Sequence, residues 1–143
     1  MKKLKELGDF SLLSIEDDAF NQELAIAVFD DINNISIYRA SDGKEGLDIL
    51  QKNSIDIILL DLLMPKMSGL ELLKMLKTDS LYSNIPIIVI TSKADEKTVT
   101  YKLGADDFIS KPYHPEELKL RVFNHLRIKQ FNELLNQKNI TIN

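Results

Sequence analysis

Two apolar runs that end in acidic residues constrain the fold of this chain more than any other feature. The first run, Phe10–Ile15, leads into Glu16–Asp18, and the second run, Ile55–Leu60, leads into Asp61. A strand that is apolar on nearly every residue requires burial on both faces, as in a parallel sheet covered by helices. A carboxylate at the tip of such a strand is costly to hold there unless its charge is compensated. The two tips together therefore predict a site for a divalent cation.

The composition fits one globular domain and excludes several classes of function. The 143 residues can bury a core, and 44% hydrophobic with 28% charged residues is ordinary for a globular chain. A formal net charge of −4 argues against direct nucleic-acid binding, which needs a basic surface. Because the chain has no cysteine, disulfides, thiol nucleophiles and zinc–thiolate sites are excluded.

No segment is expected to enter a membrane. The charged start, Met1–Glu6, lacks the apolar stretch of a secretory signal. No apolar run approaches the roughly 20 residues that a membrane helix requires. We therefore expect a cytoplasmic protein without a membrane partner.

Hydrophobic periodicity predicts strands that alternate with helices. The expected strands are Phe10–Ile15, Ile35–Ala40, Ile55–Leu60, Ile87–Ile90 and Asp107–Ser110. The expected helices cover Glu23–Asp31, start near Gly43 and Ser68, cover Glu96–Leu103, and run from Pro115 to about Lys138. This alternation implies an α/β fold, a doubly wound five-stranded parallel sheet with helices on both faces. In such sheets ligands bind at the carboxyl ends of the strands.

Polar residues follow four of these strands and should meet at that edge. They are Glu16 and Asp17, Asp61, Thr91, and Lys111. Repulsion between close carboxylates raises at least one pKa, and Mg²⁺ relieves it because Mg²⁺ prefers oxygen ligands. A carboxylate, Mg²⁺, a lysine and a hydroxyl can together hold a transferring phosphoryl group, with Asp61 as the nucleophile. For Asp18, a part in the site and a role as helix cap are both open.

The chain resembles the receiver domain of bacterial two-component response regulators, with a flavodoxin-like fold, from about Phe10 to Leu126. The matching motifs occur in the family's order, and their combination is highly specific. They are Glu16-Asp17, Asp61 with Met64-Pro65 and Ser68-Gly69, Thr91, Gly104-Ala105-Asp106-Asp107-Phe108, and Lys111-Pro112.

The resemblance implies that Asp61 accepts a phosphoryl group from the phosphohistidine of a sensor histidine kinase or a histidine phosphotransfer protein. It also implies that Asp17, Asp61 and the backbone carbonyl of Leu63 ligate Mg²⁺ directly, while Glu16 acts mainly through water. The protein would then be a regulatory switch that catalyses only its own phosphorylation and dephosphorylation.

The resemblance assigns roles to the remaining site residues as well. Thr91 would bond a phosphoryl oxygen, Lys111 would pair with the phosphate, and the Lys111–Pro112 peptide would be cis. Phe108 stands at the position of the switch aromatic, although a fixed core residue is an equally good interpretation. The segment from Thr91 to Lys111 is slightly shorter than in the family, which predicts a shortened helix after Thr91 and an altered signalling surface.

Two other classes of function are weighed against the receiver. A small Mg²⁺-dependent phosphatase with an aspartyl nucleophile usually carries a second aspartate two residues after the first, where this chain has Leu63. A pseudo-receiver, which binds partners without being phosphorylated, is disfavoured by the complete set of acidic residues and lysine.

The last helix is longer than the sheet requires, so the chain divides into an N-terminal extension (1–9), a receiver domain (10–126) and a helical extension or linker (127–143). Leu118, Val122 and Leu126 should pack on the domain. A second apolar stripe, formed by Ile128, Phe131, Leu134 and Leu135, has no evident cover. It is either a frayed amphipathic tail, or a homodimer contact or linker to an output domain, and we favour the second interpretation.

Overall fold

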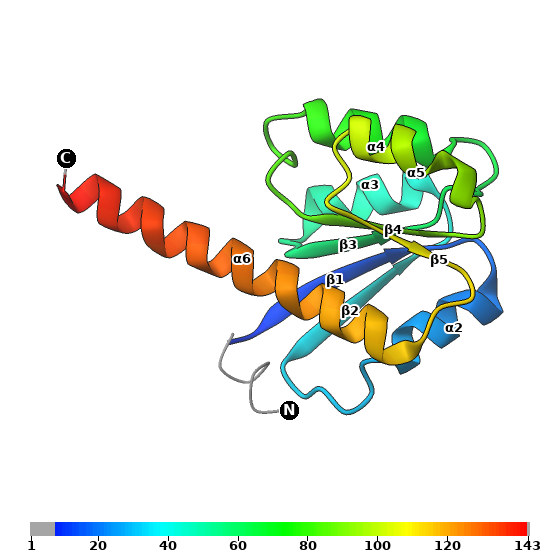
Figure 1. The fold of residues 1–143 in the computed structure, drawn as a ribbon, viewed down its shortest axis with the longest axis horizontal. Coiled ribbons are helices and arrows are strands. Elements are labelled where there is room, and N and C mark those ends of the chain that lie inside the picture. Colours follow the sequence, from blue (N-terminus) through cyan, green and yellow to red (C-terminus); the bar gives the residue numbers. More distant parts are fainter. Residues whose placement is uncertain (1–7, 143) are drawn as a thin grey trace.

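A five-stranded parallel sheet forms the centre of the molecule (Figure 1). The computed structural model describes residues 8–142, with side chains described as far as Gln137. The strands are β1 (Phe10–Ile15), β2 (Ile35–Ala40), β3 (Ile57–Leu60), β4 (Ile87–Thr91) and β5 (Asp107–Ser110), in the spatial order β2-β1-β3-β4-β5. This order, with β1 in the interior, is that of a doubly wound sheet, so the predicted fold class is confirmed.

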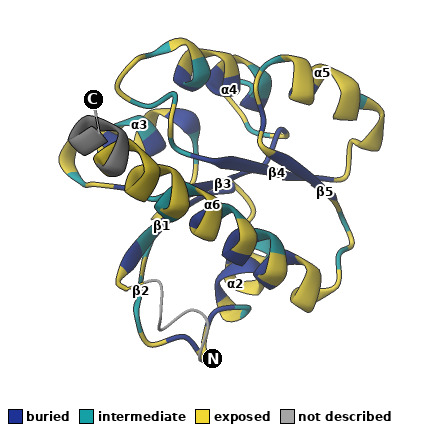
Figure 2. Ribbon diagram, turned by 60° about the vertical axis from the view of Figure 1, so that its left-hand side comes forward, coloured by how far each residue is buried: buried dark blue, intermediate teal, exposed yellow. Residues whose placement is uncertain are grey.

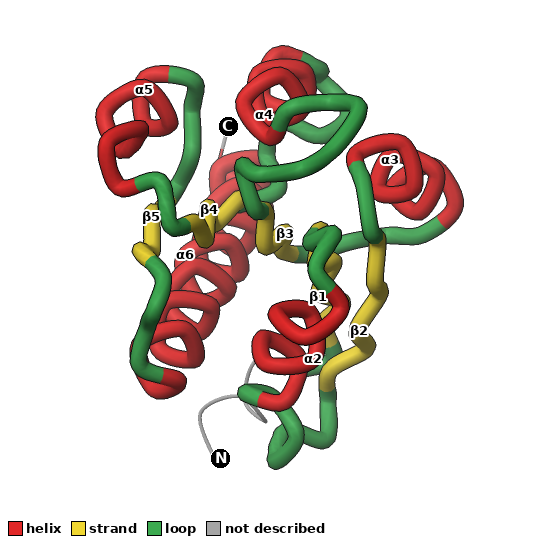
Figure 3. Tube along the Cα trace, turned by 90° about the vertical axis from the view of Figure 1, so that its right-hand side faces the viewer, coloured by secondary structure: helices red, strands yellow, loops and turns green. Residues whose placement is uncertain are grey.

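Helices cover both faces of the sheet (Figure 3). One face carries α2 (Ala19–Ala27) and α6 (Pro115–Ile142). The other face carries α3 (Gly43–Lys52), α4 (Gly69–Thr78) and α5 (Lys97–Lys102), the last preceded by a 3₁₀ turn, Ala94–Glu96. In the described residues, no helix is long and apolar enough to span a membrane.

The alternation of side chains along each strand builds two hydrophobic cores. Leu12 of β1 and Ile57 of β3 face α2 and α6. Leu13 of β1 and Ile58 of β3 face α3 and α4. All four side chains are at most 1% exposed, and Figure 2 shows the interior strands buried along their length. The prediction that these strands are buried on both faces is therefore confirmed.

The first helix begins earlier than its apolar pattern indicated. Asp18 caps α2 by accepting a hydrogen bond from the amide of Asn21 at 2.8 Å, so the helix begins at Ala19 rather than Glu23. The buried face contains Ala25 and Ile26, whereas Leu24 is exposed. The apolar residues of this segment fit two different faces of a helix, so their pattern did not fix where the helix begins. The cap at Asp18 does fix it.

Several other local predictions are confirmed. Gly104 adopts a positive φ of 105° just after α5, as a C-terminal cap requires. The Lys111–Pro112 peptide is cis. The helix after Thr91 is short, six residues in α5. The last helix extends to Ile142. Residues 1–7 of the predicted N-terminal extension lie outside the described residues.

A buried polar clip joins α2 to the ends of β1 and β2, and it explains Ser14, an unusual residue inside an apolar strand. The Ser14 hydroxyl donates to Oε1 of Gln22. Nε2 of Gln22 donates to the carbonyl of Ser14 at 3.2 Å and to that of Ala40 at 3.1 Å. Both side chains are buried, and each polar atom of the Gln22 amide has a partner.

Gly69 lets the loop after β3 fold back against the strand end. A Cβ atom at this position would lie 2.5 Å from Cα of Leu62 and 2.7 Å from the carbonyl oxygen of Asp61, which are backbone atoms that cannot move aside. The amide of Gly69 donates to the carbonyl of Leu62 at 3.2 Å, and Ser68 caps the helix that follows. The glycine therefore fixes the approach of α4 to Asp61.

Replacement of Gly69 by alanine should destabilise the fold by about 2 kcal/mol, because the added methyl group overlaps backbone atoms. The matched control is Gly43→Ala, since Gly43 is also the first residue of a capped helix. There the new Cβ meets the mobile side chain of Met67 at 3.1 Å. Urea unfolding of both variants tests the prediction, which fails if the two lose equal stability.

Gln22→Leu should cost about 2 kcal/mol of unfolding free energy, because it strips hydrogen bonds from the buried Ser14 hydroxyl and from two carbonyls. The double variant Ser14→Ala/Gln22→Leu should lose less than the sum of the two single variants, since the pair interacts directly. A double-mutant cycle from denaturant melts measures this coupling. Additive losses would show that the clip does not act as a unit.

Candidate functional site

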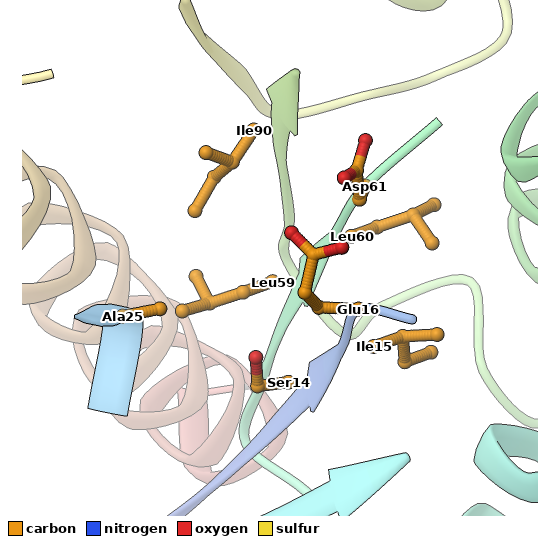
Figure 4. A pocket seen from close by; sticks show the side chains of 8 residues that line it. All are labelled: Ser14, Ile15, Glu16, Ala25, Leu59, Leu60, Asp61 and Ile90. Atoms are coloured by element: carbon orange, nitrogen blue, oxygen red, sulfur yellow. The ribbon is translucent and has the colours of Figure 1, made fainter. Parts of the chain in front are cut away.

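The pairing of β1 with β3 places Glu16 beside Asp61. Ile15 and Leu60 are partners in the parallel register, and the amide of Asp61 donates to the carbonyl of Ile15 at 3.1 Å. The next residue of each strand therefore emerges at the same point of the carboxyl edge, as Figure 4 shows. Glu16 is 8% exposed and Asp61 is 6% exposed. Two carboxylates are thus held together in a largely dehydrated position.

Lys111 directly follows β5, at one edge of the sheet, and its side chain reaches both carboxylates. Its Nζ lies 2.6 Å from Oε1 of Glu16 and 2.9 Å from Oδ2 of Asp61. The backbone amide of Lys111 donates to the carbonyl of Thr91 at 2.9 Å, so the end of β4 fixes where the lysine leaves β5. Charge-assisted bonds of this length stabilise buried carboxylates in the ionised form.

The second oxygen of each carboxylate accepts a hydrogen bond from a nearby backbone amide. Oδ1 of Asp61 accepts from Leu63 at 3.0 Å, and Oε2 of Glu16 accepts from Asp18 at 3.2 Å. Each carboxylate is therefore oriented at both ends, by Lys111 on one oxygen and by the backbone on the other. This leaves neither side chain free to rotate without losing a bond.

Burial and charge shift the pKa values of two of these groups. Burial raises the pKa of Glu16 from 4.5 to about 7, with a contribution from neighbouring Asp61, although the bond to Lys111 opposes the shift. Burial alone would lower the pKa of Lys111, but its hydrogen bonds to Glu16 and Asp61 outweigh this and raise it. The site therefore concentrates negative charge that one lysine only partly compensates.

Asp17 completes an oxygen-rich cluster that suits a hard divalent cation. Although Asp17 is exposed, one oxygen each of Glu16, Asp17 and Asp61 lies within 4.8 Å of the others. Carboxylate oxygens are the ligands that Mg²⁺ prefers, and three carboxylates here are accompanied by one lysine. The donor set thus fits Mg²⁺. The ligand role of the Leu63 carbonyl stays a prediction.

Thr91 and Phe108 lie on adjacent strands beside the carboxylates. Thr91 is the fully buried last residue of β4, and its Oγ1 accepts a hydrogen bond from the amide of Lys93 at 3.3 Å. Phe108, in β5, is buried in the core under α4. The structure thus shows Phe108 as a core residue, and its movement as a switch stays a prediction.

The predicted site residues thus come together, but two residues that support their strands, Ser14 and Gln22, were not predicted from the sequence. Ser14 and Gln22 lie directly behind the carboxylates, where Ser14, Glu16 and Asp61 line a cavity of about 20 Å³ (Figure 4). That volume holds a single water molecule. A polar residue four positions before Ile26, on the same side of the helix, was the sequence signal that could have revealed Gln22.

In metal-free protein, stability should fall as the pH rises from 4.5 to 7, by about 2 kcal/mol from Glu16 alone. Across this window native Glu16 retains a proton that the unfolded chain has released, so rising pH favours unfolding. Urea melts in EDTA measure the trend. The Glu16→Gln variant should lose this component, and an unchanged pH profile in that variant would contradict the raised pKa.

Comparisons with known proteins identify the family. The sequence model of the response regulator receiver domain matches residues 12–123. The transcriptional regulatory protein CiaR of Streptococcus pneumoniae is 36% identical over 92% of this chain and 59% of its own length. The response regulator SaeR of Staphylococcus aureus is 35% identical over 84% of this chain and 52% of its own length. The chain thus spans little more than half the length of these relatives.

Solved structures of response regulators are similar to this chain as well. A putative response regulator from Chloroflexus aurantiacus is 30% identical with a TM-score of 0.78, covering 83% of this chain and 98% of that one. The receiver domain of a Francisella response regulator is also 30% identical, with a TM-score of 0.75 and the same coverage of the two chains. From the family match and from these likenesses, the chain belongs to the response regulator receiver domain family.

Proposed function

We propose that this receiver domain is a phosphorylation-dependent switch that accepts a phosphoryl group on Asp61. The observation that carries the proposal is the buried Asp61 carboxylate, oriented by Lys111 at 2.9 Å and by the amide of Leu63 at 3.0 Å. A carboxylate fixed in this way is a preorganised nucleophile, because little ordering is needed before it reacts. Because the chain belongs to the receiver family, its general role is that of a regulatory signalling domain.

The reaction transfers phosphorus from nitrogen to oxygen. An oxygen of Asp61 forms the new O–P bond while the P–N bond of a donor phosphohistidine breaks, and the electron pair leaves with the imidazole nitrogen. Lys111 stabilises negative charge on the equatorial oxygens of the phosphoryl group, and the Thr91 hydroxyl donates to one of them. Bound Mg²⁺, held by Asp17 and Asp61 with Glu16 beside them, would supply further positive charge to the same oxygens.

Phosphorylation would change conformation through Thr91 and Phe108. The only polar partner of the Thr91 hydroxyl among the bonds described above is a long hydrogen bond from Lys93, so a phosphoryl oxygen competes for it at small cost. Movement of Thr91 would change the packing along the β4–β5 pair, where Thr91 is the partner of Ser110 and Phe108 lies two residues earlier on β5. This is a population shift between two packings, driven by the affinity of one of them for the phosphoryl group.

The phosphodonor, a sensor histidine kinase or a histidine phosphotransfer protein, would dock beside Lys111. An apolar hollow of about 280 Å³ lies there, lined by residues of α2 that include Leu24 and by Lys111, Pro112, Tyr113 and Pro115. Phe20, also on α2, is 71% exposed. These side chains offer apolar contact area next to the nucleophile, as a donor helix carrying its phosphohistidine would need.

The domain limits follow from burial. Among the residues of α6 whose side chains are described, as far as Gln137, Leu126 is the last buried one, which supports a receiver domain of residues 10–126 and a helical extension or linker of residues 127–143. Because this chain spans only 59% of the length of CiaR and 52% of that of SaeR, control of an output domain or of a separate partner is part of the proposal.

The main competing function is a Mg²⁺-dependent phosphatase with the same nucleophile. The position where such enzymes carry a general acid is Leu63, which is apolar and 44% exposed. Without an acid there, the leaving group of a small phosphoester is not protonated, so turnover should be absent.

Acetyl phosphate with Mg²⁺ should add one phosphate to the wild-type chain and none to Asp61→Asn, because the amide is not nucleophilic. Intact-mass spectrometry and loss of the phosphate in alkali identify the acyl phosphate. Asp18→Asn is the matched control, since asparagine caps a helix as well as aspartate and Asp18 is not proposed as the phosphoacceptor.

Three results would overturn the proposal. Equal labelling of Asp61→Asn would show that another residue is the phosphoacceptor. Steady turnover of p-nitrophenyl phosphate by the wild type, abolished in Asp61→Asn, would favour the phosphatase. A pseudo-receiver would take up no phosphate in any variant.

A further inference from the structure

The helix α6 has apolar side chains on two opposite sides. Leu118, Val122 and Leu126 are buried in the core, at most 5% exposed. The other side carries a row that we call the outer stripe. Its members are Leu120, Ile128, Phe131, Leu134 and Leu135, with exposures of 52%, 55%, 61%, 52% and 42%. Their spacings of 3, 4, 8 and 11 residues place them along one side of the helix.

Part of the outer stripe lies beyond the domain, although Ile128 and Leu135 line a hollow together with Asn84 and Pro86. Figure 1 shows α6 crossing the sheet from the C-terminal ends of the strands and extending past their N-terminal ends. Figure 2 shows this overhanging part mostly exposed as far as it is coloured. A soluble domain rarely exposes a contiguous set of large apolar side chains without a partner for them.

An ion pair holds the helix where it leaves the domain. Nζ of Lys129 lies 3.3 Å from Oδ1 of Asp56, at the start of β3, and 3.1 Å from Oε1 of Glu133. Asp56 is itself fixed, because its Oδ2 accepts from the amide of Ser11 at 2.7 Å. The helix therefore continues in a set direction past Leu126, which argues against a frayed tail.

The charges near the stripe are engaged elsewhere. Lys129 and Glu133 project from the side of the helix that faces the domain. Arg127, which helical spacing places between stripe members, donates to Oδ1 of Asn124 at 2.6 Å and lies over the ring of Phe123 at 5.2 Å. The outer stripe thus presents apolar groups together with uncharged Asn124 and one arginine that already has partners.

The charges around the outer stripe indicate which kind of partner binds to it. A helix that binds an anionic bilayer surface needs several free lysines or arginines on its polar face, whereas Lys119, Arg121 and Lys129 of α6 are paired with Asp31, Asp107 and Asp56. A second copy of this chain brings an identical apolar stripe and meets no opposed free charge. Two helices packed along the stripe would bury on the order of 1,000 Å², which a specific interface requires.

We propose that the outer stripe is a homodimer contact in which the α6 helices of two copies pack in parallel. In the parallel arrangement the full stripe from Leu120 to Leu135 faces its own copy over four turns. An antiparallel pair of overhangs would match only the part from Ile128 to Leu135. Asn124 then faces its own copy inside the contact, where a single polar pair fixes register. This contact is independent of phosphorylation at Asp61.

Sedimentation equilibrium of the whole chain should give twice the monomer mass of 16.3 kDa at micromolar concentration. The variant Phe131→Asn/Leu134→Gln should raise the dimer dissociation constant at least about 30-fold, because two anchors of the contact are lost. Both positions lie outside the core, and circular dichroism checks the fold. Leu81→Gln is the matched control, since Leu81 is a large apolar residue that is 78% exposed and does not belong to the outer stripe.

Because the chain has no cysteine, single cysteines report the arrangement directly. Oxidised Asn124→Cys should form a disulfide-linked dimer, as parallel helices bring the two positions together. Asn136→Cys should not, because position 136 lies on the side of Lys129 and Glu133.

Three results would overturn the proposal. One is a monomer at every concentration, including a monomer that sediments with phosphatidylglycerol vesicles. Another is a dimer that Phe131→Asn/Leu134→Gln leaves intact. The third is a dimer in which Asn136→Cys cross-links and Asn124→Cys does not, since the helices would then meet through a different side.

Discussion

The parallel pairing of β1 with β3 is the constraint on which the rest of the structure depends. Because Ile15 is the partner of Leu60, each strand delivers a carboxylate to the same point of the sheet edge. A shift of one residue would turn one of the two side chains to the other face. The apolar residues that precede Glu16 and Asp61 are buried on both faces, so the register cannot change without exposing the core.

This register brings two carboxylates together, and their mutual repulsion is partly offset by one lysine from a distant part of the chain. Lys111 is separated from Glu16 by 95 positions in the sequence, yet its Nζ is 2.6 Å from that carboxylate. The pKa of Glu16 is raised mainly because the side chain is buried, and neighbouring Asp61 adds to the shift. A cation bound at this cluster would favour the ionised form of both carboxylates.

The strands and the residues at their ends could be predicted from the sequence, because continuous apolar runs admit few other structures. The ends of helices were harder. For the first helix, the pattern around Leu24 and the pattern around Ile26 are both periodic, and only the cap at Asp18 decides between them. The clip of Ser14 and Gln22 was not predicted, because a buried polar pair looks in sequence like two unrelated polar residues. Its partners include the carbonyl of Ala40, which only the tertiary fold brings near.

The path of α6 gives the molecule a mechanical property. The helix begins four residues after Lys111, at Pro115, and runs for 28 residues, roughly 40 Å at 1.5 Å per residue. The ion pair between Lys129 and Asp56 holds the helix where it leaves the sheet, so the helix can pivot about this contact. A tilt of the first turn about this contact, next to the loop that carries Lys111, moves the overhanging turns in the opposite direction by a similar distance, because about as many residues of α6 precede Lys129 as follow it.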